Sequence, residues 1–137
     1  SDLRAQLYRN GCEQGLTPFT LQAPSAIISD RALIGAGTVM LTRAVLHPEA
    51  NIGQNTIINT GAIIEHHAQI GDHTHVAPGA LICGGAQVGE NSIIGAGAIL
   101  LPGIKVGNNT MIGAGSVVTK NIGHGETAFG NPAHASS

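Results

Sequence analysis

Large aliphatic residues recur at every sixth position of this chain, from residue 28 to residue 118. The stretch 22–123 divides into seventeen consecutive hexapeptides without an insertion, and sixteen of them begin with Ile, Leu, Val or Met; Gln22 is the exception. The fifth position is Ala, Ser or Thr in all but two hexapeptides, which carry Ile104 and Ile122. A strict period of six matches neither the 3.6-residue period of a helix nor the two-residue alternation of an ordinary strand. It predicts a repeat architecture.

Three short strands joined by turns would form one triangular coil of 18 residues, with the large residue of each hexapeptide pointing inward and the small residue lying near a corner. A second period supports this arrangement, because glycines at the second hexapeptide position are spaced by 18: Gly35, Gly53, Gly71, Gly89 and Gly107. A coiled coil or a helical solenoid would not combine the two periods. The sequence therefore predicts an all-β fold, a parallel β-helix of about six triangular coils over residues 22–123.

The segments before and after the repeat do not follow the six-residue period. Residues 2–15 predict a short helix on which Leu3, Leu7 and Tyr8 share a face, ended by a glycine. A helix of this length is marginal alone, so we expect it to pack on other structure. Residues 1–21 are thus interpreted as helix and connector, and 124–137 as a tail that leaves the repeat, with a turn at 130–133 that closes the last coil.

Composition narrows the function. Only 10% of residues are charged and the net charge is −2. The chain therefore lacks the excess of Lys and Arg that is typical of nucleic-acid-binding proteins. No apolar run approaches the roughly 20 residues of a membrane helix, and the first residues lack the apolar region of a signal peptide. Cys12 and Cys83 lie in unrelated segments and make no disulfide framework, so a reducing cytoplasmic location is expected.

The hexapeptide resembles that of the hexapeptide-repeat acyltransferases, which fold as left-handed parallel β-helices. Residues 59–89, 95–107 and 113–133 are similar to the sialic-acid and bacillosamine group of sugar acetyltransferases. This resemblance implies direct transfer of acetyl from acetyl-CoA to the amino group of a nucleotide-linked amino sugar, or to a hydroxyl of a sialic acid, for cell-surface glycans. By the same resemblance, we expect neither a metal nor a covalent acetyl-enzyme. It also implies a homotrimer with each active site between two chains.

Members of this group usually carry an N-terminal Rossmann-like domain that binds the sugar nucleotide. That domain ends in a short helix that leads into the β-helix. By this resemblance, residues 1–21 are the remnant of such a domain and 22–123 are the acetyltransferase domain.

The resemblance also implies the residues of the reaction. His66 is the general base, a task that suits an imidazole with its ordinary pKa near 6.5. Gly84 lies 18 residues later, hence one coil above His66, where it leaves the approach open and its N–H could hold the thioester carbonyl. The residue after the base is usually acidic in this group, but here it is His67. Glu65, or Glu49 one coil below His67, could replace that carboxylate; the alternative for both is a solvated surface residue.

Five further positions match the acetyl-CoA site of the group. His75 and Asn59 would line it, although Asn59 could instead serve a turn. Ala96 and Ala114, 18 apart, would let the pantetheine arm lie against the backbone, but small residues also suit tight coils. Lys120 would approach the phosphates of CoA, and the alternative is a solvated lysine.

Two other functions remain open at this point. The first is a zinc hydratase of the γ-carbonic anhydrase type, whose three ligands would come from histidines across a subunit boundary; the candidates are His47, His66, His67, His73 and His75. The second is a non-catalytic module that only forms trimers.

Overall fold

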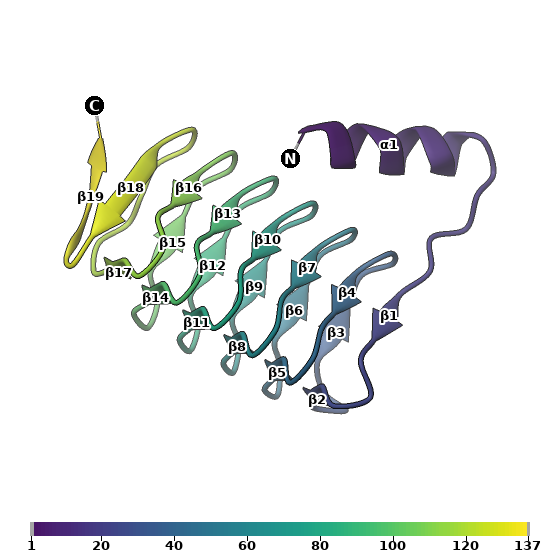
Figure 1. Ribbon diagram of the computed structural model, residues 1–137, viewed down its shortest axis with the longest axis horizontal. Coiled ribbons are helices and arrows are strands. Elements are labelled where there is room, and N and C mark those ends of the chain that lie inside the picture. The colour runs from purple at the N-terminus through teal and green to yellow at the C-terminus, as the bar shows by residue number, and fades with distance from the viewer. Residues whose placement is uncertain (1, 137) are drawn as a thin grey trace.

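The computed structural model describes residues 2–136, which form one helix followed by a stack of triangular coils (Figure 1). The helix α1 is Asp2–Glu13. Strands of two residues then alternate among three sheets, here named sheets A, B and C, and every strand is parallel to its neighbours except for the last pair. The predicted all-β parallel β-helix of about six coils is confirmed.

The strand bounds follow the six-residue period. Sheet A contains β1 (Leu21–Gln22), β4 (Val39–Met40), β7 (Ile57–Ile58), β10 (His75–Val76), β13 (Ile93–Ile94), β16 (Met111–Ile112), β18 (Thr127–Gly130) and β19 (Ala133–Ser136). Sheet B contains β2 (Ile27–Ile28), β5 (Val45–Leu46), β8 (Ile63–Ile64), β11 (Leu81–Ile82), β14 (Ile99–Leu100) and β17 (Val117–Val118). Sheet C contains β3 (Leu33–Ile34), β6 (Asn51–Ile52), β9 (Gln69–Ile70), β12 (Gln87–Val88) and β15 (Lys105–Val106).

Successive coils pair in an 18-residue register, for example Ile64 with Ile82. The second residue of each strand points into the prism, and those from β4 onward are at most 4% exposed up to β17. Small fifth-position residues such as Ala68 and Thr74 are buried beside them at the corners. The Thr74 hydroxyl donates to the carbonyl of Gly89 in the next coil, which satisfies a polar group that would otherwise be buried without a partner.

The glycines spaced by 18 are required by how closely the coils stack. A β-carbon on Gly71 would lie 2.6 Å from the backbone nitrogen of Glu90, a distance that real contacts do not reach. Glycines at the corner tips have another cause, because Gly79 adopts φ +69° with open space around it. Asn55, Asn91 and Asn109 adopt the same left-handed conformation at other corners.

Helix α1 lies along the corners between sheets C and A (Figure 1). The Arg4 guanidinium donates to the carbonyls of Asn55 and His73, and burial lowers its pKa. The Tyr8 hydroxyl bonds to Gln54 at 3.0 Å, and the Tyr8 ring meets the His73 ring edge-on. The helix therefore packs, as expected, but through Arg4, Ala5 and Tyr8. Leu3 and Leu7 take no part in this packing, since both are more than 60% exposed.

The tail continues the repeat further than predicted. Strand β18 pairs with β16 in parallel and extends sheet A beyond residue 123. Residues 130–133 then form the predicted turn, which leads into β19, antiparallel to β18. The hairpin covers the C-terminal end of the stack, because Ala128 and Ala133 are buried against the last coils.

The two classes of glycine predict different costs of substitution. Gly71→Ala should destabilise the fold by about 1–3 kcal/mol, because its methyl group meets backbone that cannot move without separating two coils. Gly79→Asn should cost less than about 1 kcal/mol, because the space is open and Asn tolerates positive φ. Urea unfolding followed by circular dichroism measures both, and equal midpoints for the two variants would contradict this account of the repeat.

Candidate active site

His66 lies at the corner between sheets B and C, directly after β8, with its side chain exposed. Its ring packs against Gly84 in the next coil, since a β-carbon on Gly84 would lie 2.7 Å from both Cε1 and Nε2 of His66. The expected stacking of Gly84 on His66 is thus confirmed. The backbone N–H of Gly84 makes no hydrogen bond within residues 2–136. The corner therefore presents an imidazole and an unpaired donor side by side.

The other face of the His66 ring system contacts a second histidine. Nδ1 of His66 lies 3.2 Å from Nδ1 of His67, and the ring centroids are 5.4 Å apart in an edge-on arrangement. His67 lies at the corner tip with a left-handed backbone, φ +60°. The sequence predicts His67 as the place of a missing carboxylate and as a candidate zinc ligand, and not as a partner of His66. Its contact with His66 depends on the corner conformation, which the residue types alone did not reveal.

The structure brings neither Glu65 nor Glu49 to His66. Oε1 of Glu65 lies 3.6 Å from Nε2 of His47, one coil below. Oε1 of Glu49 accepts a hydrogen bond of 2.9 Å from Nε of Arg31, also one coil below. Within residues 2–136, neither carboxylate hydrogen-bonds to the His66 or His67 ring. Each carboxylate is engaged with a basic residue of the preceding coil.

Asn59 and His75 form a second polar pair away from His66. His75 projects from β10 on the outer face of sheet A, and Asn59 begins the corner between sheets A and B. Nδ2 of Asn59 lies 3.0 Å from Nε2 of His75. Burial lowers the pKa of His75, and the positive charge of Arg4 adds to this effect. Within one chain this pair lies on a different face from His66.

The remaining predicted residues follow the edges of the prism. Ala96 and Ala114 occupy the corner between sheets A and B in successive coils, where Gly115 N–H donates to Ala96 C=O at 2.8 Å. Both side chains are exposed, and because they are small they leave the backbone of that edge accessible. Lys120 is exposed at the corner between sheets B and C, 36 residues and so two coils beyond Gly84.

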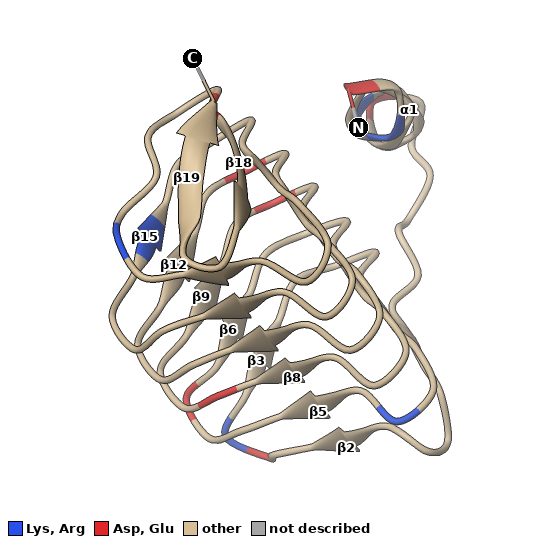
Figure 2. Ribbon diagram, turned by 60° about the vertical axis from the view of Figure 1, so that its left-hand side comes forward, with Lys and Arg blue, Asp and Glu red and all other residues tan. Residues whose placement is uncertain are grey.

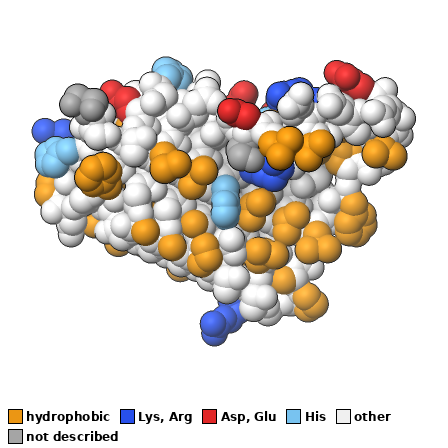
Figure 3. Space-filling view, turned by 45° about the horizontal axis from the view of Figure 1, so that its top comes forward, with side chains coloured by type: hydrophobic (Ala, Val, Ile, Leu, Met, Phe, Trp, Pro, Cys, Tyr) orange, Lys and Arg blue, Asp and Glu red, His pale blue; other side chains and the backbone are white. Residues whose placement is uncertain are grey.

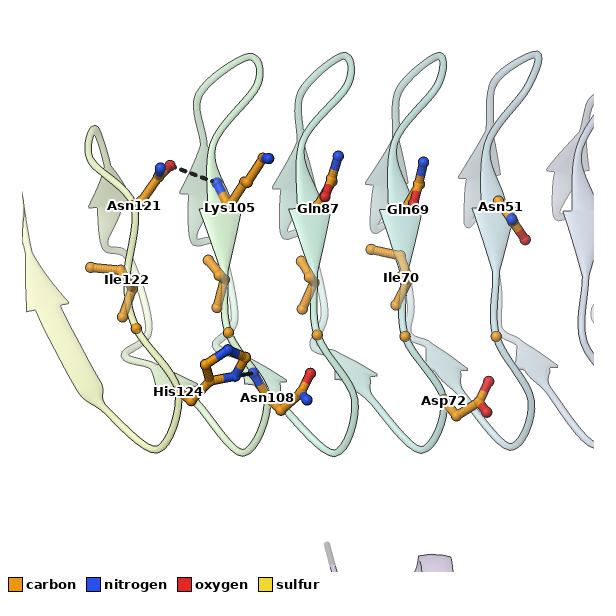
Figure 4. A pocket seen from close by; sticks show the side chains of 17 residues that line it. Asn51, Gln69, Ile70, Asp72, Gln87, Lys105, Asn108, Asn121, Ile122 and His124 are labelled. Atoms are coloured by element: carbon orange, nitrogen blue, oxygen red, sulfur yellow. Dashed lines mark hydrogen bonds between the residues drawn. The ribbon is translucent and has the colours of Figure 1, made fainter.

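A hollow with a volume of about 600 Å³ lies elsewhere, on sheet C. Figure 4 shows side chains standing side by side along β6, β9, β12 and β15, over a floor of strand backbone and glycines. These are Asn51, Gln69, Gln87 and Lys105. The hollow contains none of the predicted site residues. The polar outward positions spaced by 18 were a visible signal that the sequence reasoning did not use.

Residues 2–136 contain neither a group of side chains arranged to bind a metal ion nor a membrane-spanning helix. No three side chains of His, Cys, Asp or Glu gather closely enough there to hold a metal ion. The five histidines considered for zinc are thus not assembled within one chain. No helix of the described chain is long and apolar enough to cross a membrane.

Comparison with known proteins places the chain in a family. The sequence profile of the bacterial transferase hexapeptide family, with six repeats, matches residues 49–84 and 85–120. The chain belongs to the hexapeptide transferase family. A search of curated protein sequences gives no significant match.

Several solved structures are similar to this hexapeptide transferase. The acetyltransferase domain of PglB from Neisseria gonorrhoeae is 33% identical with a TM-score of 0.97, and the match covers 98% of this chain and 66% of that one. PerB from Caulobacter crescentus, in complex with CoA and GDP-perosamine, is 32% identical with a TM-score of 0.98, covering 99% and 66%. WeeI from Acinetobacter baumannii is 28% identical with a TM-score of 0.93, covering 98% and 66%. The chain thus spans slightly less than two thirds of the length of these proteins.

The low pKa of His75 predicts acid sensitivity of the fold. The unfolded chain takes up a proton near pH 6.5, whereas folded His75 resists protonation because it is partly buried. Stability should therefore fall as the pH drops below about 6.5. His75→Gln should reduce the change in melting temperature between pH 7.5 and pH 5.5, measured at fixed protein concentration. An unchanged pH dependence in this variant would contradict the assignment.

Proposed function

We propose that this hexapeptide transferase is an acetyl-CoA-dependent acetyltransferase that transfers acetyl directly to the amino group of a nucleotide-linked amino sugar. One observation carries the proposal: the exposed His66 imidazole lies against Gly84, at a corner where no side chain covers it. The similarity to PglB, solved with acetyl coenzyme A, and to PerB, solved with CoA and GDP-perosamine, supports the same reaction class.

The geometry suits acyl transfer to an amine. Nε2 of His66 takes the proton as the amine nitrogen attacks the thioester carbon, so that no free ammonium has to form at the reacting centre. The carbonyl oxygen, which becomes negatively charged in the tetrahedral intermediate, accepts a hydrogen bond from the free N–H of Gly84. Collapse of the intermediate breaks the C–S bond and leaves the amide. The leaving thiolate of CoA then receives the proton from His66.

Acetyl-CoA would lie along the edges of the prism. The exposed backbone at Ala96 and Ala114 can accept the pantetheine arm without a steric obstacle, and the lysine at 120 offers a cation to the phosphates of CoA. Asn59 and His75 would contact the co-substrate from sheet A, where their mutual hydrogen bond fixes the His75 ring. These roles rest on the proposed reaction.

The outer faces of the prism favour a homotrimer. Outward positions on sheets A and B are apolar from β1 to β17 apart from His75, whereas those on sheet C are polar from β6 onward. Figure 3 shows hydrophobic side chains gathered on one face of the molecule below α1. The apolar positions are Val39, Ile57, Ile93 and Met111 on sheet A, and Val45, Ile63, Leu81, Ile99 and Val117 on sheet B. Contiguous apolar surfaces of this kind mark protein interfaces. Charged residues are few and lie mainly at corners and on α1, as Figure 2 shows, so they do not oppose packing of sheet A on a neighbour's sheet B.

A threefold arrangement would also complete the site. Packing sheet B of one chain against sheet A of the next brings the edge that carries His66 toward a neighbour's Asn59–His75 pair, and closed threefold symmetry repeats this contact three times. We assign acceptor binding to a Rossmann-like domain, to which residues 1–21 would connect. The exposed Leu3 and Leu7 of α1 suit a contact with it. The hydroxyl of a sialic acid is the second class of acceptor that we propose. The thiols of Cys12 and Cys83 are free, which fits an enzyme of the reducing cytoplasm.

Turnover tests the proposed function. The protein should consume acetyl-CoA in the presence of a panel of nucleotide-linked 4-amino sugars, with amide product detected by mass spectrometry. His66→Ala should lower kcat by about 10²- to 10⁴-fold, the usual contribution of a general base. His134→Asn, which removes an exposed histidine on β19, is the matched control. Equal turnover of the wild-type protein and His66→Ala would exclude His66 as the base.

Solution mass tests the trimer. Light scattering should give three times the 13.8 kDa mass of the chain. Leu81→Asp places a charge on the apolar face of sheet B and should shift the mass toward one chain, while Gln87→Asp on the polar face of sheet C should leave it unchanged. The assembly would be assigned to the wrong faces if Gln87→Asp dissociated it and Leu81→Asp did not.

A further inference from the structure

The catalytic corner contains two histidines whose Nδ1 atoms face each other. The distance of 3.2 Å between His66 Nδ1 and His67 Nδ1 is within hydrogen-bonding range. A hydrogen bond between two ring nitrogens requires one to carry a proton and the other to present a lone pair. Only one proton fits between the two rings. The tautomers of His66 and His67 are therefore coupled.

We propose that His67 is a positioning residue, which accepts a hydrogen bond from Nδ1–H of His66 and so holds His66 in the tautomer whose Nε2 lone pair faces the reaction. This inference rests on the proposed function of His66 as the base. It assigns the orienting task to a neutral imidazole rather than to a carboxylate. Nε2, which lies next to Gly84, is the atom that this tautomer leaves free to take a proton.

The surroundings leave His67 as the available partner. Oε1 of Glu65 lies 3.6 Å from Nε2 of His47, and Glu49 accepts a hydrogen bond from Arg31, each in the coil below. Cys83 follows β11 one coil above Glu65, and burial together with the charge of Glu65 raises its pKa. Among the charged and titratable groups of the adjacent described coils, His67 alone hydrogen-bonds to the His66 ring.

The backbone conformation at residue 67 indicates which residues can replace His67. His67 occupies a left-handed corner, φ +60°, a conformation that side chains with a β-carbon rarely adopt. The equivalent corner position holds Gly85, φ +69°, and Gly103, φ +72°, in the next two coils, and Glu49, φ +64°, in the coil below. Gly and Glu are therefore both compatible with this backbone. The corner offers matched replacements that remove or restore a hydrogen-bond acceptor without changing the turn.

Protonation of His67 has a specific consequence. A positively charged His67 carries hydrogens on both ring nitrogens, so its Nδ1 can no longer accept. Two hydrogens cannot share a gap of 3.2 Å, and His66 must then move its own proton to Nε2, the atom that has to act as the base. The active form requires both rings to be neutral. The acid limb of log kcat/KM against pH should accordingly reach a limiting slope of two.

Two variants of the full chain test this inference by steady-state kinetics. His67→Gly should lower kcat about tenfold or more, leave KM for acetyl-CoA within about twofold, and reduce the limiting slope of the acid limb to one. His67→Glu should restore kcat to within a few-fold, because its carboxylate accepts from Nδ1–H, and should also give a slope of one. His134→Asn should match the wild type, and melting temperatures should confirm that all variants are folded. Unchanged kcat and an unchanged slope in His67→Gly would overturn the inference.

A second measurement does not depend on turnover, so it separates failure of this inference from failure of the proposed function. Nitrogen NMR of the ¹⁵N-histidine-labelled protein at pH 8 should show His66 protonated at Nδ1 and unprotonated at Nε2. In His67→Gly, His66 should become a mixture of the two tautomers. A mixture already present in the wild-type protein would show that His67 does not hold the His66 ring, whatever the activity.

Discussion

The hydrogen-bonded stacking of one 18-residue coil on the next is the constraint on which the rest of this structure depends. Strands β1 to β17 have only two residues each, so none of them is stable by itself. The backbone hydrogen bonds between coils and the inward aliphatic residues hold the stack together. Close stacking leaves no room for a β-carbon at Gly53, Gly71 or Gly89. It also fixes which residues meet across coils. The contact between His66 and Gly84 is a direct result of this register.

Residues whose place is set by that register could be predicted from the sequence. The inward positions, the corner glycines and the stacking of Gly84 on His66 follow from counting six and eighteen along the chain. Side-chain contacts at the corners could not be predicted in this way. Arg31 and His47 lie beside Glu49 and Glu65, and the His67 ring contacts the His66 ring. These contacts depend on local side-chain rotamers.

The flanks were harder to predict than the repeat. On α1, Leu3 and Leu7 are exposed, whereas Arg4 and Tyr8 pack against the β-helix. Arg4 and Tyr8 donate hydrogen bonds to corner carbonyls, which leucines could not do. Strand β18 joins sheet A although its residues break the hexapeptide pattern, since the exposed edge of β16 offers a row of free backbone groups. In both cases the packing depends on free backbone groups of the β-helix. A pattern of hydrophobic and polar residues does not show where such groups lie.

The three faces of the prism carry different kinds of side chain. Sheets A and B present mainly aliphatic residues, and sheet C presents amides and Lys105 around the hollow described above. His66 lies on the boundary between sheets B and C, and Asn59 with His75 lies on sheet A. Such a division is consistent with an active site at the edge of a subunit interface, where one chain supplies the base and another a binding surface.

A crystal structure of the protein with acetyl-CoA bound tests the central claim most directly, because it locates the thioester. The account predicts that the carbonyl oxygen of the thioester accepts a hydrogen bond from the N–H of Gly84, with the acetyl carbon close to Nε2 of His66. A thioester bound instead in the hollow of sheet C, remote from both residues, would contradict it.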